Sequence, residues 1–139
     1  MRIFKNAWFQ RFARKERIAD AVLCDAADRA ERGQVDADLG SGVLKQRVAR
    51  PGSGKSGGYR TILFFRAGDR AVFVYGFAKS DRDNIDEDEE AAFKRAAKEV
   101  LALSEAQLNA LVRRGRFVEV DCDGDKGKEV SKRGARSRP

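Results

Sequence analysis

The segment from Leu44 to Arg66 holds the side chains best suited to chemistry on a phosphate group. It contains six cations and no acid; the cations are Lys45, Arg47, Arg50, Lys55, Arg60 and Arg66. A guanidinium group binds phosphate oxygens through paired hydrogen bonds, and a lysine supplies a compact positive charge. This composition favours a polyanionic ligand, of which RNA and DNA are the commonest in a cell. The alternative is a solvated basic surface that binds no ligand.

The stretch PGSGKSGGYR, residues 51–60, matches part of a nucleotide-binding P-loop. Gly54, Lys55 and Ser56 supply the end of the G-x-x-x-x-G-K-[ST] pattern, but Ala49 stands where its first glycine belongs. A P-loop also runs into a helix, whose N-terminus helps to hold the phosphates. Here YRTILFF follows, and its β-branched and aromatic residues predict a strand. We therefore interpret the stretch as a basic loop that joins two strands.

The chain contains no histidine. This excludes histidine-based nucleases and triad hydrolases, and acid–base chemistry near neutral pH must use other groups. Cleavage of RNA through its own 2′-hydroxyl needs a proton acceptor, a group that stabilises charge on the phosphorane, and a proton donor for the leaving oxygen. A lysine among like charges loses its proton more readily, so Lys55 or Lys45 is a candidate base, with Arg60 as the phosphate ligand.

Two of these residues also have plainer explanations. Tyr59 either stacks on a nucleobase, as aromatics do in single-strand readers, or lines the core as a strand aromatic. Arg60 either binds phosphate or pairs with an acid on the last helices. Gly57 and Gly58 serve a turn, and they would also let a phosphate approach the backbone closely.

The spacing of apolar residues predicts the elements that position these groups. Residues 2–5 alternate as a short strand, and Asn6 is a candidate N-cap for a helix that carries Trp8, Phe9 and Phe12. A second helix follows and stops near Gly33, and residues 34–42 are predicted to be a loop. Three strands come next, at residues 44–49, 59–65 and 71–77, with a turn at Gly68-Asp69.

Two later helices are marked by capping boxes. The first pairs Asp86 with Glu89, and the second pairs Ser104 with Gln107 and ends near Gly115. The predicted fold is α+β, with a small antiparallel sheet of about four strands packed with N-terminal and C-terminal helices.

The chain has 139 residues and a net charge of +7, and its length and composition indicate one domain, residues 1–120, followed by a tail. Cys24 and Cys122 are far apart and lack C-x-x-C spacing, so neither a zinc site nor a disulfide is expected, and Cys24 is predicted to be a small core residue in a cytoplasmic protein. No signal peptide or membrane span is evident. Residues 121–139 are predicted to form a disordered basic tail because they contain almost no large apolar residue.

With this order of elements, the chain resembles RelE-superfamily toxins of type II toxin–antitoxin systems, in particular the RelE/HigB-like branch. The segments RVARPGSGKSGGYRTILFF (residues 47–65) and FVYGFAKSDRDNI (residues 73–85) carry the resemblance, which covers residues 1–120. It implies a domain that cleaves mRNA in the ribosomal A site without a metal or cofactor. It also implies a partner, a small DNA-binding antitoxin encoded by the adjacent gene.

The resemblance suggests a role for individual residues as well. Lys55, Arg60 and Lys79 match the family's basic catalytic positions, while Lys45, Arg47, Arg50, Tyr59 and Arg82 are candidate RNA contacts. Residues 84–86 read Asn-Ile-Asp where RelE has a tyrosine, so a tyrosine role there is absent. The basic residue after the last strand is also shifted, which makes Arg82 a weaker candidate than Lys79. Lys79 has a plainer explanation as an exposed residue after a strand.

Two further functions remain open at the level of sequence. One is a non-enzymatic poison of DNA gyrase, like the ParE branch of the superfamily, whose toxicity would survive loss of Lys55 and Arg60. The other is an RNA-binding module that cuts nothing and whose binding weakens steeply with salt.

Overall fold

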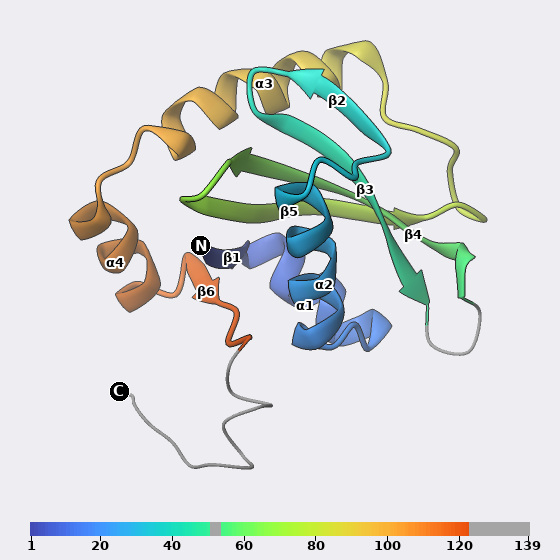
Figure 1. Cartoon of the computed structure of the whole chain (residues 1–139), viewed down its shortest axis with the longest axis horizontal. Coiled ribbons are helices and arrows are strands. Elements are labelled where there is room, and N and C mark those ends of the chain that lie inside the picture. The colour runs from blue at the N-terminus through green and yellow to red at the C-terminus, as the bar shows by residue number, and fades with distance from the viewer. Residues whose placement is uncertain (51–53, 123–139) are drawn as a thin grey trace.

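The structure of the chain is a computed structural model that describes residues 1–50 and 54–122, and for residues 54–57 the backbone alone. Its strands are β1 (Arg2–Asn6), β2 (Ala37–Gly40), β3 (Val43–Arg50), β4 (Gly54–Arg66), β5 (Arg70–Ala78) and β6 (Phe117–Glu119). Its helices are α1 (Ala7–Glu16), α2 (Asp20–Glu31), α3 (Glu87–Leu101) and α4 (Glu105–Arg113). One sheet in the order β2-β3-β4-β5-β1-β6 joins all six strands (Figure 1). The predicted α+β class is confirmed.

The sheet has more strands than predicted, and it is mixed rather than purely antiparallel. β1 runs parallel to β5, with Ile3 opposite Ala71 and Lys5 opposite Phe73. β6 pairs with the other side of β1, and it is too short to leave a periodic signal. β2 lies in the segment predicted as a loop, because this polar edge strand is fixed mainly by its pairing with β3.

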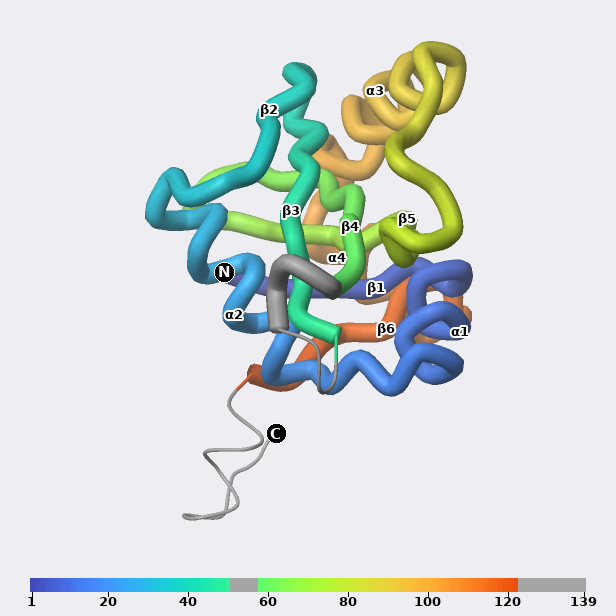
Figure 2. Tube along the Cα trace, turned by 90° about the vertical axis from the view of Figure 1, so that its right-hand side faces the viewer, coloured from blue at the N-terminus to red at the C-terminus, as the bar shows by residue number. Residues whose placement is uncertain are grey.

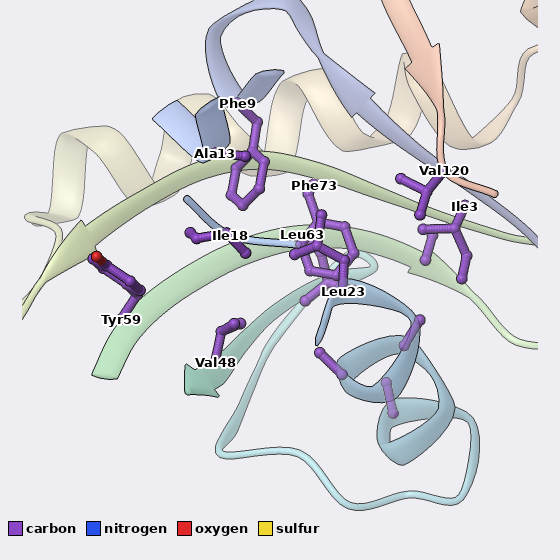
Figure 3. Packing of buried hydrophobic residues seen from close by; sticks show 14 of the residues in the cluster. Ile3, Phe9, Ala13, Ile18, Leu23, Val48, Tyr59, Leu63, Phe73 and Val120 are labelled. Carbon is purple, nitrogen blue, oxygen red and sulfur yellow. The ribbon is translucent and has the colours of Figure 1, made fainter. Parts of the chain in front are cut away.

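Each face of the sheet is covered by one pair of helices. α1 and α2 pack on one face through a cluster that includes Phe9, Leu23, Leu63 and Phe73 (Figure 3). α3 and α4 pack on the other face around Ile62, Phe64 and Leu108. We call these the α1/α2 face and the α3/α4 face. Figure 2 shows α3 at the top of the view and α1 and α2 lower down, at the level of β1 and β6.

The helices begin where their sequences predict. The Asn6 side chain accepts a hydrogen bond from the Phe9 amide at 2.7 Å, which caps α1. Both predicted capping boxes are present, Asp86 with Glu89 at α3 and Ser104 with Gln107 at α4. These caps satisfy amides that would otherwise lack partners at the helix N-termini.

The glycine-rich stretch forms part of a strand. β4 begins at Gly54 rather than at the predicted Tyr59, and residues 55–58 lie opposite the single residue Ala49 of β3, which makes a bulge. A Cβ atom on Gly58 would lie 2.1 Å from the Val48 carbonyl oxygen, so the close approach of the two strands requires glycine. A strand on each side and no following helix exclude the P-loop context.

The expectation that the two cysteines stay separate is wrong. Cys24 of α2 and Cys122, which follows β6, form a disulfide with Cα atoms 5.8 Å apart. Their distance along the chain hid this pairing, because the fold brings α2 and the end of β6 to the same cluster on the α1/α2 face. Of the predicted tail, residues 123–139 lie outside the described residues, while Cys122 is bonded to the folded domain.

Candidate functional site

Three of the predicted cations share the α3/α4 face of the sheet. Gln46 and Val48 of β3 point to the α1/α2 side, so strand alternation directs Lys45 and Arg47 to the opposite face. Arg60 of β4 lies directly opposite Arg47 in the ladder, and Ile62 lies opposite Lys45. We call Lys45, Arg47 and Arg60 the cation patch.

Arg60 is the least compensated member of the cation patch. Its Nη1 atom is buried and has no hydrogen-bond partner among the described residues. Arg47 pairs with Asp36, whose Oδ1 lies 3.7 Å from the Arg47 Nε, and both side chains are more than a third exposed. Like charges directly opposite each other destabilise a sheet. The arrangement therefore favours an anion bound between the two guanidinium groups.

The segment between β5 and α3, residues 79–86, bounds the cation patch. Arg82 lies over the Phe77 ring at 5.5 Å, and Phe77 is paired with Arg60 in the ladder. Asn84 accepts a hydrogen bond of 3.1 Å from the Lys45 Nζ of β3. The side chains of this segment thus link β5 to β3 on this face of the sheet.

Arg82 is engaged within the protein. Its guanidinium donates to both carboxylate oxygens of Glu89, at 2.7 and 3.1 Å, and to the Tyr75 hydroxyl at 3.0 Å. The hydrogen bond from Arg82 holds the pKa of Glu89 below its usual value, and the Glu89 carboxylate raises the pKa of Arg82. Glu89 also caps α3. The hydrogen bonds between Arg82 and Glu89 therefore hold the N-terminus of α3 in place relative to the segment 79–86.

Tyr59 differs from its prediction as an RNA contact. It is 1% exposed and belongs to the buried cluster on the α1/α2 face (Figure 3). It packs edge-on against Phe12 with ring centroids 5.5 Å apart, and it donates a hydrogen bond of 2.7 Å to Glu16. Burial, together with the Glu16 carboxylate, raises the pKa of Tyr59 to about 12. The ring lines the core on the α1/α2 face and is not available to stack on a base. Arg50, which is exposed, lies 5.6 Å from this ring.

The two lysines predicted to be catalytic, Lys55 and Lys79, lie on β4 and just after β5, near the position of Arg60 in the sheet. Lys79 is exposed and directly follows Ala78, which pairs with Tyr59, the residue before Arg60. The backbone of Lys55 lies in the β4 bulge, and its side chain lies outside the described residues. Within the part of the chain that the structure describes, no three His, Cys, Asp or Glu side chains gather in a way that could hold a metal ion.

Sequence reasoning missed the residues that hold the cations in place. These are Asp36 beside Arg47, Asn84 beside Lys45, and Glu89 beside Arg82. Of these, Glu89 had a signal as part of the capping box, but its second role in binding Arg82 required the fold. Trp8 was placed on the first helix, with no signal that it would remain 38% exposed.

The fold and the cation patch define a small α+β domain with a basic sheet face. Comparison with protein-family models identifies this domain: residues 1–120 match the model described as the RelE toxin of the RelE/RelB toxin–antitoxin system. The chain belongs to the RelE toxin family, and as a toxin of such a system it has a cognate antitoxin as its partner. No curated protein and no solved structure matched the chain. None of the described helices is both long and apolar enough to cross a membrane.

Proposed function

We propose that this toxin is a metal-independent endoribonuclease that cuts mRNA bound to the ribosome and thereby inhibits translation. The observation that carries the proposal is Arg60, with a buried Nη1 that lacks a partner among the described residues and with Arg47 directly opposite. A phosphodiester bound between these groups would supply the missing acceptor and the missing negative charge. Membership of the RelE family supports mRNA as the polyanion.

The cleavage step follows from the chemistry of RNA. The 2′-oxygen attacks the adjacent phosphorus and the bond to the 5′-oxygen breaks, which leaves a 2′,3′-cyclic phosphate and a 5′-hydroxyl. Arg60 would stabilise the charge that develops on the phosphorane. Lys55 and Lys79 would transfer the two protons, one by accepting the proton of the 2′-hydroxyl and the other by donating to the leaving oxygen.

The remaining cations have a binding role in this proposal. Lys45 and Arg47 of β3 lie on the same face of the sheet as Arg60, so they would contact phosphates on either side of the cleaved one. Arg50 lies over the Tyr59 ring at the end of β3, so it would contact the RNA strand outside the cation patch. Arg82 would mainly hold the segment 79–86 beside the cation patch, because its charge is already balanced by Glu89. Ribosomes are cytoplasmic, so we place the toxin in the cytoplasm, held inactive by an antitoxin that we expect to be a small DNA-binding protein from the adjacent gene.

Expression of the toxin in cells without its antitoxin tests this function against the two alternatives. We expect translated mRNA to be cut, Arg60→Ala and Lys55→Ala to abolish toxicity, and Arg32→Ala to retain it. Arg32 is a matched control because it is exposed at the end of α2, on the other side of the sheet.

Two results would contradict the proposal. Supercoiling defects with toxicity that survives Arg60→Ala would indicate a gyrase poison. Salt-sensitive RNA binding with intact mRNA would indicate a binding module alone.

A further inference from the structure

Trp8 is an exposed aromatic residue in a protein whose other large rings are mostly covered. It is 38% exposed, and the other exposed large apolar side chain among the described residues is the terminal Met1. Trp8 lies in the first turn of α1, directly after β1 ends. A single exposed ring is common on protein surfaces, so a role for Trp8 must be argued from the residues around it.

The Trp8 ring is held in one orientation by its neighbours. It stacks on Phe12 with centroids 5.2 Å apart, and it leans on Tyr75 of β5 at 4.7 Å. Gly76 permits this packing, because a Cβ at that position would lie 2.7 Å from the Phe12 ring. A fixed aromatic surface loses little conformational entropy when a ligand binds to it.

Contacts connect Trp8 to the cation patch without a break. Tyr75 accepts a hydrogen bond from Arg82, Arg82 covers Phe77, and Phe77 lies opposite Arg60 in the ladder. An aromatic surface that continues into a row of cations is the arrangement by which proteins bind single-stranded nucleic acid, with bases on rings and phosphates on cations. An apolar protein side chain would use the indole but not the charges beside it.

We propose that Trp8, supported by Tyr75, binds a nucleobase of the RNA strand whose phosphate lies at Arg60. The inference rests on the proposed function, and it assigns to the N-terminal helix a part in substrate binding. Trp8 is a binding residue here and has no role in proton transfer. Its loss should weaken RNA binding by roughly 5- to 150-fold, the range that corresponds to the loss of one stacked base.

The fluorescence of Trp8 gives a direct test because the chain has a single tryptophan. The full chain is titrated with a 2′-O-methyl RNA oligonucleotide, which lacks the nucleophile and is not cut, and binding is followed separately by anisotropy of a dye on the oligonucleotide. We expect Trp8 emission to change in parallel with binding. An abasic residue at one position should remove the emission change and lower affinity, whereas abasic residues elsewhere should do neither.

Substitutions of Trp8 test the same inference independently of its fluorescence. Trp8→Leu should lower affinity within the stated range and Trp8→Phe should lower it less, with circular dichroism as the check on folding. Binding without any change in Trp8 emission, or emission that responds only to the antitoxin, would overturn the inference. Cleavage of ribosome-bound mRNA is measured in parallel: cleavage with an unresponsive Trp8 overturns only this inference, and a responsive Trp8 without cleavage overturns only the nuclease activity.

Discussion

Arg47 and Arg60 face each other across two paired strands, where opposite charges would be the stable choice. Natural sequences tolerate such a local conflict at functional sites, where a ligand supplies what the protein lacks. The alternative that Arg60 pairs with an acid of the last helices has no support within the described residues, where its side chain makes no hydrogen bond or ion pair and Nη1 is unsatisfied. A residue with this environment should matter more for activity than for stability.

The substitution Arg60→Met separates these two roles. It keeps the aliphatic stem and removes the charge opposite Arg47, so we expect the melting temperature to stay the same or rise. Cleavage should fall by about a hundredfold or more, as when one charge-stabilising donor is removed from an active site. Thermal unfolding and a cleavage assay measure the two effects. A clear drop in melting temperature with activity retained would instead indicate a structural ion pair.

Tyr59 makes a second prediction at this scale. In the Tyr75→Phe variant it is the remaining tyrosine, and its ultraviolet titration should have a midpoint of about 12 in the folded protein. The unfolded chain should titrate near the ordinary value of about 10. Because the folded state retains the proton longer, stability that is present below that unfolded value is lost as the pH rises towards the folded pKa.

Glu16 supplies the control for this titration. Removing its carboxylate charge by Glu16→Gln should lower the midpoint, since the hydrogen bond and charge of Glu16 both raise the pKa of Tyr59. A folded protein whose Tyr59 titrates at the ordinary value would contradict the buried position of the ring.

A disulfide and a side-chain hydrogen bond link elements that are distant in sequence. The disulfide ties α2 to the end of β6, and Lys45 with Asn84 ties β3 to the residues before α3. The disulfide belongs to the α1/α2 face, whereas the cation patch lies on the other side of the sheet. Its loss should therefore affect stability and leave the chemistry of the patch in place.

Reduction of the disulfide tests this separation. It joins residues 98 apart in sequence, so opening it should lower the free energy of unfolding by about 2 to 5 kcal/mol. Urea unfolding with and without dithiothreitol measures the loss, and the Cys24→Ser/Cys122→Ser variant should be insensitive to reductant. Two free thiols in the protein under oxidising conditions would contradict the pairing. The stability of the reduced form is relevant because a toxin located in the reducing cytoplasm would carry the two cysteines as thiols.

The β4 bulge should not tolerate a side chain at Gly58. Gly58→Ala places a Cβ against the Val48 carbonyl, and the strand must shift at a cost of about 1 to 3 kcal/mol. We expect cleavage to fall as well, because the bulge positions Lys55 and Arg60. Gly33→Ala is the comparison: it has open space but a φ of +79°, so it should lower the melting temperature and leave cleavage unchanged. Equal activity of both variants would argue against a functional bulge.

Over the whole molecule, the features set by residues close together in sequence were predicted, whereas pairings between distant segments were not. The caps at Asn6, Asp86 and Ser104 and the three central strands were predictable, because each depends on residues a few positions apart. The parallel pairing of β1 with β5, the edge strand β2 and the disulfide were not, because they join segments far apart in sequence. The basic character of the site followed from composition, whereas the burial of Tyr59 and the exposure of Trp8 depended on packing.

Cleavage on purified ribosomes tests the central claim most directly. Ribosomes are programmed with an mRNA and stalled with an empty A site, the purified toxin is added, and the cut is mapped by primer extension. The wild-type chain and Arg32→Met should cut within the A-site codon, while Arg60→Met should leave the mRNA intact. Intact mRNA with the wild-type toxin, or equal cleavage by Arg60→Met, would contradict the proposal that Arg60 of the cation patch takes part in cleaving the phosphodiester it binds.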